Sequence, residues 1–423
     1  MFNIEFIEIL IGNVQLYIFD VFILLSLSLI FLRKVMISII NPLTIGILST
    51  VFADTIPLFL FQLNLISWEK FFFVFFCEIC FWFFFLYYFN KRNSPSKAIL
   101  HEKYYLERLF RICFCSIVFY YSFVFVYSGI GLLRGNRFDV YNEQPILMLL
   151  AGFSTFPTMF CYLYGYEMLH ARKYKKGILV ILIMATFSFL SGGKGAIVAV
   201  FTSYFIYRHF YLNKRISIPK YVYGLLFLFP LLTLAISRNT DISMAFGSFL
   251  FRIVQYGDCY WMGLPDKTLD ALAVSSPISY IFNPFLKLFG LGIEHREAFG
   301  NMIISEINPD YKNVQGGPNA RCPITAYILF QQYGFIFASI CGIISSFLAF
   351  RIRKYIPRGF FGLTVYGTFY SMSLSIATDP LMVLQNFLKT IFVIILLYIY
   401  LVKVLNARVV KIHSSRSAFQ NSK

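Results

Sequence analysis

The chain has 423 residues, of which 58% are hydrophobic and 13% are charged, and its formal net charge is +17. This composition excludes an ordinary soluble globular protein, in which about a quarter of the residues are charged. In a soluble chain the positive charge would indicate nucleic acid, but in a polytopic membrane protein it reflects basic cytoplasmic loops, so we expect no nucleic-acid partner.

Apolar stretches of about the length that a bilayer requires recur along the chain. They predict an all-α polytopic membrane protein with about eleven transmembrane helices, forming a single multi-pass domain over residues 1–423. No basic start precedes the first stretch, so we expect it to serve as the targeting signal, without a cleavable signal peptide. The expected spans, in chain order, are 15–32, 35–62, 68–89, 112–132, 146–166, 177–190, 196–210, 221–237, 323–350, 359–378 and 381–401.

Basic residues are unevenly distributed between the loops that join these spans. With the N-terminus placed outside, the segments after odd-numbered spans, together with Arg208 at the end of the seventh span, hold 25 of the 37 Lys and Arg residues but 3 of the 20 Asp and Glu residues. Because Lys and Arg are enriched on the cytoplasmic side, we expect the N-terminus on the outer side and the C-terminus in the cytoplasm. The long segment 238–321, between the eighth and ninth spans, is then a large outer loop.

The outer loop 238–321 is the only long inter-span segment that is not strongly basic, and it should hold most of the reacting groups. Its aromatic clusters at 249–251, 256–261 and 280–289 could stack on sugars or lie in the membrane surface. The last of these is amphipathic, which favours an interfacial helix.

Four cations are expected near the outer ends of spans: Lys194, Arg238, Arg252 and Arg321. Lys194 lies in a glycine turn whose backbone N–H groups can form an anion-binding nest. Arginine donates two parallel hydrogen bonds to phosphate, so the set suits a lipid-linked pyrophosphate. The alternative is that these side chains snorkel or contact lipid headgroups.

Other chemical motifs are absent from the sequence. The turn 191–195 lacks the spacing of a phosphate loop, and there is no H-E-x-x-H, paired C-x-x-C or G-x-S-x-G motif. We therefore expect neither a metal site nor a cofactor. Asp20 and Glu78 lie inside spans, where ionisable residues are functional candidates, but here helix packing is the favoured interpretation.

Two of the eight cysteines, Cys259 and Cys322, are expected near the outer face. They could form a disulfide in an oxidising space or remain free thiols. Spacing alone does not choose between these alternatives.

The layout of the chain resembles the Wzy-type O-antigen (oligosaccharide repeat-unit) polymerases. The shared features are about eleven spans, a short Gly-Lys-Gly turn midway and one large late outer loop. The loop also ends in a similar run, Gly316-Gly317-Pro318-Asn319-Ala320-Arg321-Cys322-Pro323, followed by Tyr327 and Gln332-Tyr333-Gly334-Phe335.

The resemblance implies a glycosyltransferase of the C type in a bacterial inner membrane, with a periplasmic N-terminus and a periplasmic loop 238–321. It would polymerise oligosaccharide repeat units carried on undecaprenyl pyrophosphate, which serve as both donor and acceptor. Membrane lipids and a chain-length regulator protein are the further partners. By position, Lys194, Arg238, Arg252 and Arg321 would hold pyrophosphate, and Gly317, Pro318 and Asn319 would belong to the substrate loop. The candidate base for the acceptor hydroxyl is Asp258, Glu294 or His295.

Two rival functions fit parts of the same pattern. An O-antigen ligase shares the donor and the loop layout but transfers the glycan to lipid A core. A flippase for lipid-linked sugar would be expected to carry charges through its spans and to lack a large one-sided loop. The few charges expected inside the spans favour the enzyme.

Overall fold

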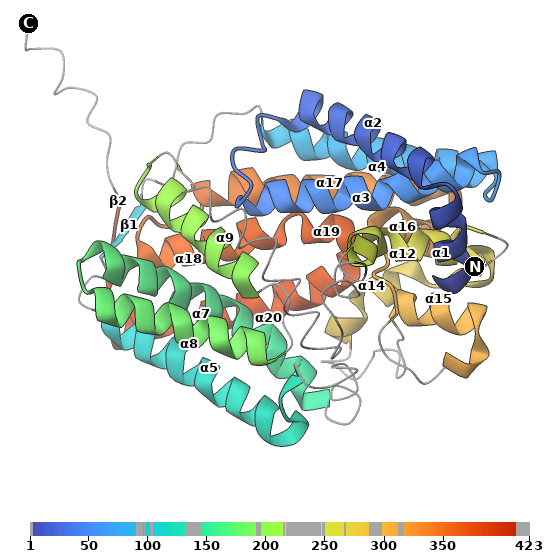
Figure 1. Cartoon of the computed structure of the whole chain (residues 1–423). Coiled ribbons are helices and arrows are strands. Elements are labelled where there is room, and N and C mark those ends of the chain that lie inside the picture. Colours follow the sequence, from blue (N-terminus) through green and yellow to red (C-terminus); the bar gives the residue numbers. More distant parts are fainter. Residues whose placement is uncertain are drawn as a thin grey trace, which may run out of the picture.

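The computed structural model describes residues 3–89, 96, 98–101, 105–131, 145–191, 196–214, 216, 247, 250–265, 268–286, 298–311 and 317–411. This part of the chain is mostly helical (Figure 1). The long helices are α2 (Val14–Leu32), α3 (Pro42–Gln62), α4 (Trp68–Phe89), α5 (Leu106–Ser128), α7 (Pro145–His170), α8 (Tyr174–Leu190), α9 (Ala196–Ile206), α17 (Gly334–Ser346), α18 (Phe360–Met372) and α20 (Pro380–Ile399).

Shorter elements join and cover these helices. The short α-helices are α1 (Asn3–Gly12), α12 (Asp258–Gly263), α13 (Thr268–Ala271), α14 (Pro277–Leu286), α15 (Phe299–Ile307), α16 (Cys322–Phe330) and α19 (Ser375–Thr378). Single turns of 3-10 or π-helix are η2 (Tyr207–Tyr211), η3 (Gln255–Gly257), η5 (Pro309–Tyr311), η6 (Gln331–Tyr333), η7 (Phe347–Arg351), η8 (Ile352–Lys354) and η9 (Tyr400–Val404). Two short strands, β1 (Ala98–His101) and β2 (Arg408–Lys411), pair antiparallel.

Six helical stretches in the described residues are long and apolar enough to cross a membrane. They are Val14–Leu32, Pro42–Gln62, Trp68–Phe89, Leu106–Tyr127, Cys322–Lys354 and Pro380–Val404. The prediction of a helical, multi-pass membrane protein is therefore confirmed in outline. The full count of spans stays a prediction, and the expected span 221–237 lies outside the described residues.

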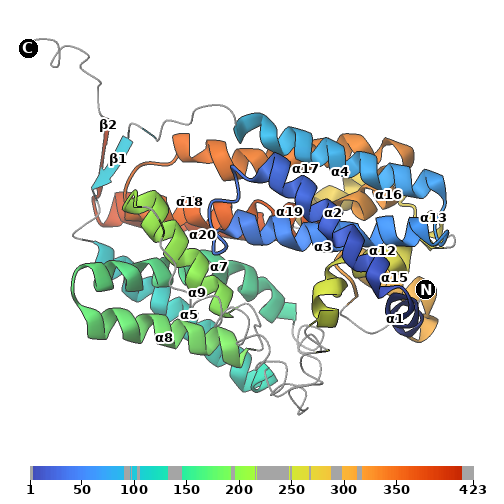
Figure 2. The ribbon, with the colours of Figure 1, turned by 45° about the horizontal axis from the view of Figure 1, so that its top comes forward.

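The predicted basic and outer-loop segments lie at opposite ends of the helical bundle (Figures 1 and 2). At one end, β2 near the C-terminus pairs with β1, and Ile99 of β1 forms a backbone bridge with Arg358. At the other end, the indole N–H of Trp261 in α12 donates to the Asn3 side chain in α1, at 3.2 Å. The N-terminal helix and the described part of the outer loop therefore share an end of the bundle. The side of a membrane that this end faces stays a prediction.

Two long helices begin with the same local signature, a capping side chain followed by proline. The Asn41 side chain accepts from the N–H of Leu43 at 3.1 Å, and the Asp379 side chain accepts from Met382 at 2.9 Å. The proline at the next position has no N–H group, and an N–H group at this position would have no hydrogen-bond partner within the helix. The helix within the expected second span, 35–62, therefore starts at Pro42 and ends at Gln62.

The expected ninth span, 323–350, lies within the apolar stretch Cys322–Lys354, but it is not one straight helix, because α16 and α17 fold back on each other. The Cys322 and Cys341 thiols are in hydrogen-bonding contact, whereas a straight helix would separate these residues by roughly 28 Å. Gly334 allows the close approach, since an added Cβ would lie 2.7 Å from the Ala326 carbonyl oxygen. The turn uses Gln331 with a left-handed backbone, φ 51°. The start of α16 consequently lies inside the bundle.

Helices α5, α7 and α8 form a second layer below the group that contains α2, α3, α4 and α17 (Figure 1). Lys176 at the start of α8 pairs with Glu107 of α5 at 2.7 Å, and Tyr164 of α7 donates to the same carboxylate. This second layer lies away from the residues described next, which belong to α2, α3, α4, α12 and α16.

Candidate functional site

The outer loop reaches the helical bundle through α12. Gly257, just before this helix, packs so closely on α3 that an added Cβ would lie 2.8 Å from the Ala53 carbonyl oxygen. Trp261 stacks on Phe6 with 4.1 Å between ring centroids. Tyr260 and Trp261 are both fully buried, so the expectation that this aromatic cluster meets sugars or the membrane surface is wrong for these two residues.

Tyr260 and Arg321 meet two acidic residues of the spans in a buried polar cluster. The Tyr260 hydroxyl lies 3.4 Å from Asp54 of α3 and 3.5 Å from Glu78 of α4. The Nε of Arg321 lies 3.9 Å from Asp54, and Arg321 has no exposed surface. We refer to these four residues, Asp54, Glu78, Tyr260 and Arg321, as the Arg321 cluster.

The position of Arg321 corrects the expectation that it lies at the outer surface beside a span end. Glu78 lies ten residues into α4, which is roughly 15 Å along the helix axis. Arg321 precedes α16, and the fold-back on α17 carries the start of α16 down to this level. Within the described residues, no nitrogen of the guanidinium has a hydrogen-bond partner that meets normal geometry. The positive charge of the Arg321 guanidinium is therefore balanced by electrostatic attraction to two carboxyl groups, those of Asp54 and Glu78.

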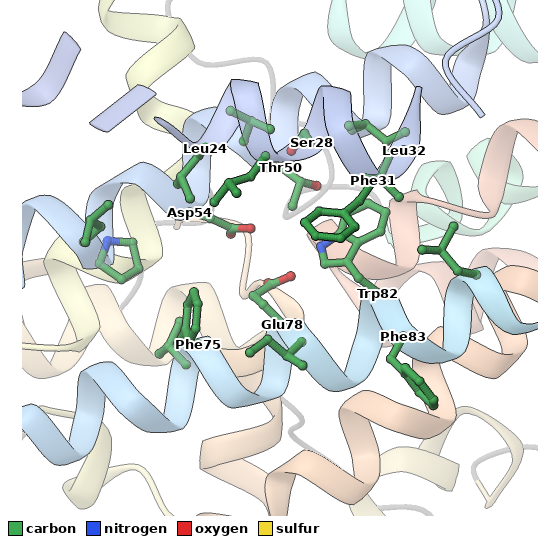
Figure 3. Close-up of a pocket in the computed structure, with 18 of the residues that line it drawn as sticks. Leu24, Ser28, Phe31, Leu32, Thr50, Asp54, Phe75, Glu78, Trp82 and Phe83 are labelled. Carbon is green, nitrogen blue, oxygen red and sulfur yellow. The ribbon is translucent and has the colours of Figure 1, made fainter. Parts of the chain in front are cut away.

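A cavity of about 430 Å³ adjoins the cluster between α2, α3 and α4. Figure 3 shows the side chains of Asp54 and Glu78 reaching into the same space from α3 and α4, with Trp82 nearby. The rest of the lining is almost entirely apolar and includes the exposed Phe31 and Phe83. Because these residues belong to apolar spans, the cavity opens toward the surface that lipid would cover.

Asp258 and Arg252 lie on the outer-loop side of the cluster. Burial raises the pKa of Asp258 to about 7, although the N–H of Cys259 and the charges of Arg252 and Arg321 favour its ionised form. Arg252 is exposed. A carboxyl that titrates near neutral pH beside cations is typical of a general base in a site that handles an anionic substrate.

The other predicted site residues divide into two groups. Lys194, Arg238, Glu294 and His295 lie outside the described residues. Gly317, Pro318 and Asn319 form a turn that packs against α15.

That turn is held by its backbone. The N–H of Gly317 donates to the Asn301 side chain at 3.0 Å, and Gly300 lies so close that an added Cβ would meet the Pro318 carbonyl oxygen at 1.8 Å. In the structure these residues stabilise the loop exit, and Asn319 alone of the three is exposed.

The two outer cysteines are free thiols in the structure, so the disulfide alternative is wrong. Cys259 and Cys322 are both buried, and Cys322 contacts Cys341 instead. Among the described residues no group of three or more His, Cys, Asp or Glu side chains could hold a metal ion.

Sequence reasoning missed the Arg321 cluster although part of its signal was visible. Glu78 was assigned to helix packing, and Asp54, inside the expected span 35–62, was given no role. Ionisable residues inside apolar spans usually pair with one another, but their partner, Arg321, comes from a segment expected outside the bundle.

Compared with protein-family models, with curated proteins and with solved structures, the chain has no detectable match.

Proposed function

We propose that this protein is a membrane glycosyltransferase that polymerises oligosaccharide repeat units carried on undecaprenyl pyrophosphate, at the outer face of a bacterial inner membrane. One observation carries the proposal. Asp258, at the loop end of the bundle, has a pKa of about 7 and feels the positive charges of Arg252 and Arg321. An acceptor hydroxyl needs a base, and the departing pyrophosphate needs positive charge.

We assign different roles to Asp258, Arg252 and Arg321 according to their exposure and contacts. Asp258 accepts the proton of the acceptor hydroxyl, because a base with a pKa near the working pH is both ionised and basic enough to act. Arg252 is exposed and can donate to pyrophosphate. Arg321 is already paired with Asp54 and acts on Asp258 through its charge. Pyrophosphate is a good leaving group, so electrostatic stabilisation supplies much of the catalysis.

Deletion of the gene, followed by gel analysis of surface polysaccharide, tests the proposal. We expect the polymer ladder to collapse to a single repeat unit on lipid A core, because ligase and flippase remain intact. Complementation with Asp258→Asn should leave the single unit, whereas Asp310→Asn, a matched change of an exposed acid in the outer loop, should restore the ladder. An unchanged ladder in the deletion strain would overturn the proposed function.

A second candidate function, a flippase for lipid-linked sugar, is favoured by one observation. Asp54, Glu78 and Arg321 place charges inside the bundle, beside a cavity that opens toward lipid. Such charges mark substrate or ion pathways in transporters. Loss of a flippase would leave lipid A core bare with no polymer made. Loss of a ligase would also leave the core bare, but polymer would accumulate on undecaprenyl.

A further inference from the structure

A second hollow, separate from the cavity of Figure 3, lies at the loop end of the bundle. It is a groove of about 1150 Å³ between the start of α4, the α13–α14 connection and the turn between α16 and α17. Figure 2 shows α13 and α16 beside this end of α4. The walls are tied together, because the N–H of Val274 donates to the Ile328 carbonyl at 3.1 Å.

One edge of the groove carries a positioned carboxylate. The Tyr327 hydroxyl donates to Asp270 at 2.5 Å, and the Lys70 ammonium lies 3.8 Å from the other carboxylate oxygen. Lys70 is itself held by the Leu264 carbonyl at 3.1 Å. The Asp270 side chain is nevertheless 44% exposed. A carboxylate has about four acceptor sites, so Asp270 is fixed in place and can still accept hydrogen bonds from a ligand.

Side-chain amides and an exposed aromatic ring extend this polar edge. Gln331 and Gln332 form the turn between α16 and α17, followed by Tyr333, which is 61% exposed. Each amide offers donors and an acceptor, which match the hydroxyl groups of a sugar. An exposed tyrosine ring presents the flat apolar face on which a sugar ring packs.

The opposite end of the groove is apolar. Phe72 and Phe76 are about half exposed and continue along α4 toward the middle of the bundle. From Glu69 to Phe76 the helix advances roughly 10 Å, and over that distance the lining changes from charged to aromatic. A ligand that fills the whole groove must therefore be polar at one end and hydrocarbon at the other.

The charge of the polar edge selects the kind of head group. Glu69 and Asp270 face one cation, Lys70. This excess of negative charge disfavours a phosphate or another anionic head group. Hydroxyl groups, in contrast, can donate to Asp270 and exchange hydrogen bonds with the glutamine amides.

We propose that the groove binds a glycolipid, with neutral sugar rings against Asp270, Gln332 and Tyr333 and the hydrocarbon chain along Phe72 and Phe76. The ligand class rests on the groove alone, and it does not depend on the proposed function.

Photo-crosslinking of the purified full-length protein in nanodiscs of zwitterionic lipid tests the proposal. The probes are decyl maltoside and decyl phosphocholine carrying the same diazirine on the chain, with labelled peptides mapped by mass spectrometry. We expect the maltoside to label the peptides that contain Phe72 and Tyr333 at least about threefold more than the phosphocholine, since one neutral hydrogen bond is worth a factor of this size.

Variants separate a sugar site from ordinary lipid contact. Gln332→Ala and Asp270→Asn should each lower maltoside labelling about threefold to tenfold, while Tyr355→Ala, a matched exposed aromatic outside the groove, should leave it unchanged. Equal labelling by both probes, or labelling that neither groove variant lowers, would overturn the proposal. Labelling does not depend on polymer formation, so an unchanged ladder in the deletion strain would refute the polymerase and leave the groove assignment standing.

Discussion

Replacing Arg321 with methionine should destabilise the protein strongly. Arg321 has no exposed surface and lies 3.9 Å from Asp54, and Glu78 shares the same buried cluster. Methionine fills much of the volume of the arginine stem but leaves two buried carboxyl groups without a cation. Removing one partner of a buried ion pair costs about 3–5 kcal/mol.

The expected loss can be read as a shift in melting temperature. Because the entropy of unfolding is about 2.1 cal/mol/K per residue, 1 kcal/mol corresponds to roughly 1 °C for a chain of 423 residues. Arg321→Met should therefore lower the midpoint by about 3–6 °C. A thiol-reactive fluorescent dye measures this directly in detergent, because most of the eight free cysteines are buried and become reactive only on unfolding.

A second substitution tests whether charge is the cause. The double variant Arg321→Met with Asp54→Asn removes the cation and one of the two carboxylates, so its midpoint should recover part of this loss relative to Arg321→Met alone. The matched control is Arg111→Met, which removes an arginine that is 75% exposed and 4.0 Å from Glu107. An exposed pair contributes at most about 1 kcal/mol, so this variant should melt close to the wild type.

Two results would refute the reasoning. A midpoint for Arg321→Met within about 1 °C of the wild type would correspond to less than about 1 kcal/mol and would show that Arg321 is not held in the buried cluster. A double variant no more stable than Arg321→Met would show that packing, and not charge, makes the residue necessary.

Three other predictions concern the outer loop. Because burial raises the pKa of Asp258 from 3.8 to about 7, polymer formation in membranes should fall about tenfold per pH unit below 7, and a flat profile from pH 5.5 to 8 would contradict its role as base. The same shift makes the stability contribution of this carboxyl greatest below pH 3.8 and lost as the pH rises through about 7. Cys259 and Cys322 should take up a mass tag equally with and without reductant after denaturation, and a reductant-dependent difference would indicate a disulfide. Gly300→Ala should lower the melting temperature through a clash with the Pro318 carbonyl, by about 1–3 kcal/mol, and a wild-type midpoint would contradict the close packing of the loop exit.

The membrane character of the chain and the separation of its basic segments from the outer loop follow from its sequence, because both depend on local composition. Apolar length identifies a helix that lipid can surround, and the distribution of Lys and Arg separates the two ends of the bundle. The helix start at Asp379-Pro380 can also be predicted from the sequence, because the capping residue and the proline are neighbours in the chain. Each of these signals lies within a few residues.

The polar cluster depends on long-range contacts and was not predictable in the same way. Asp54 and Glu78 are separated from Arg321 by more than 200 residues, and hydropathy treats 323–350 as one span. Only the fold-back at Gln331 shows that Arg321 enters the bundle. Asp258 was one of three candidates for the base, and its burial, which raises its pKa to about 7, is not recorded in the sequence. The other two candidates, Glu294 and His295, lie outside the described residues.

The Arg321 cluster also imposes an order on biogenesis. The carboxyl groups of α3 and α4 emerge from the ribosome long before the arginine that neutralises them, so a partly made chain carries uncompensated acids within its first spans. An isolated α16 has nine residues, which is too few to cross a bilayer at about 1.5 Å per residue. Its start enters the bundle where Arg321 pairs with Asp54 of α3. Formation of the hairpin therefore completes the buried cluster, and we expect chains that end before residue 321 to be degraded faster than the full-length protein.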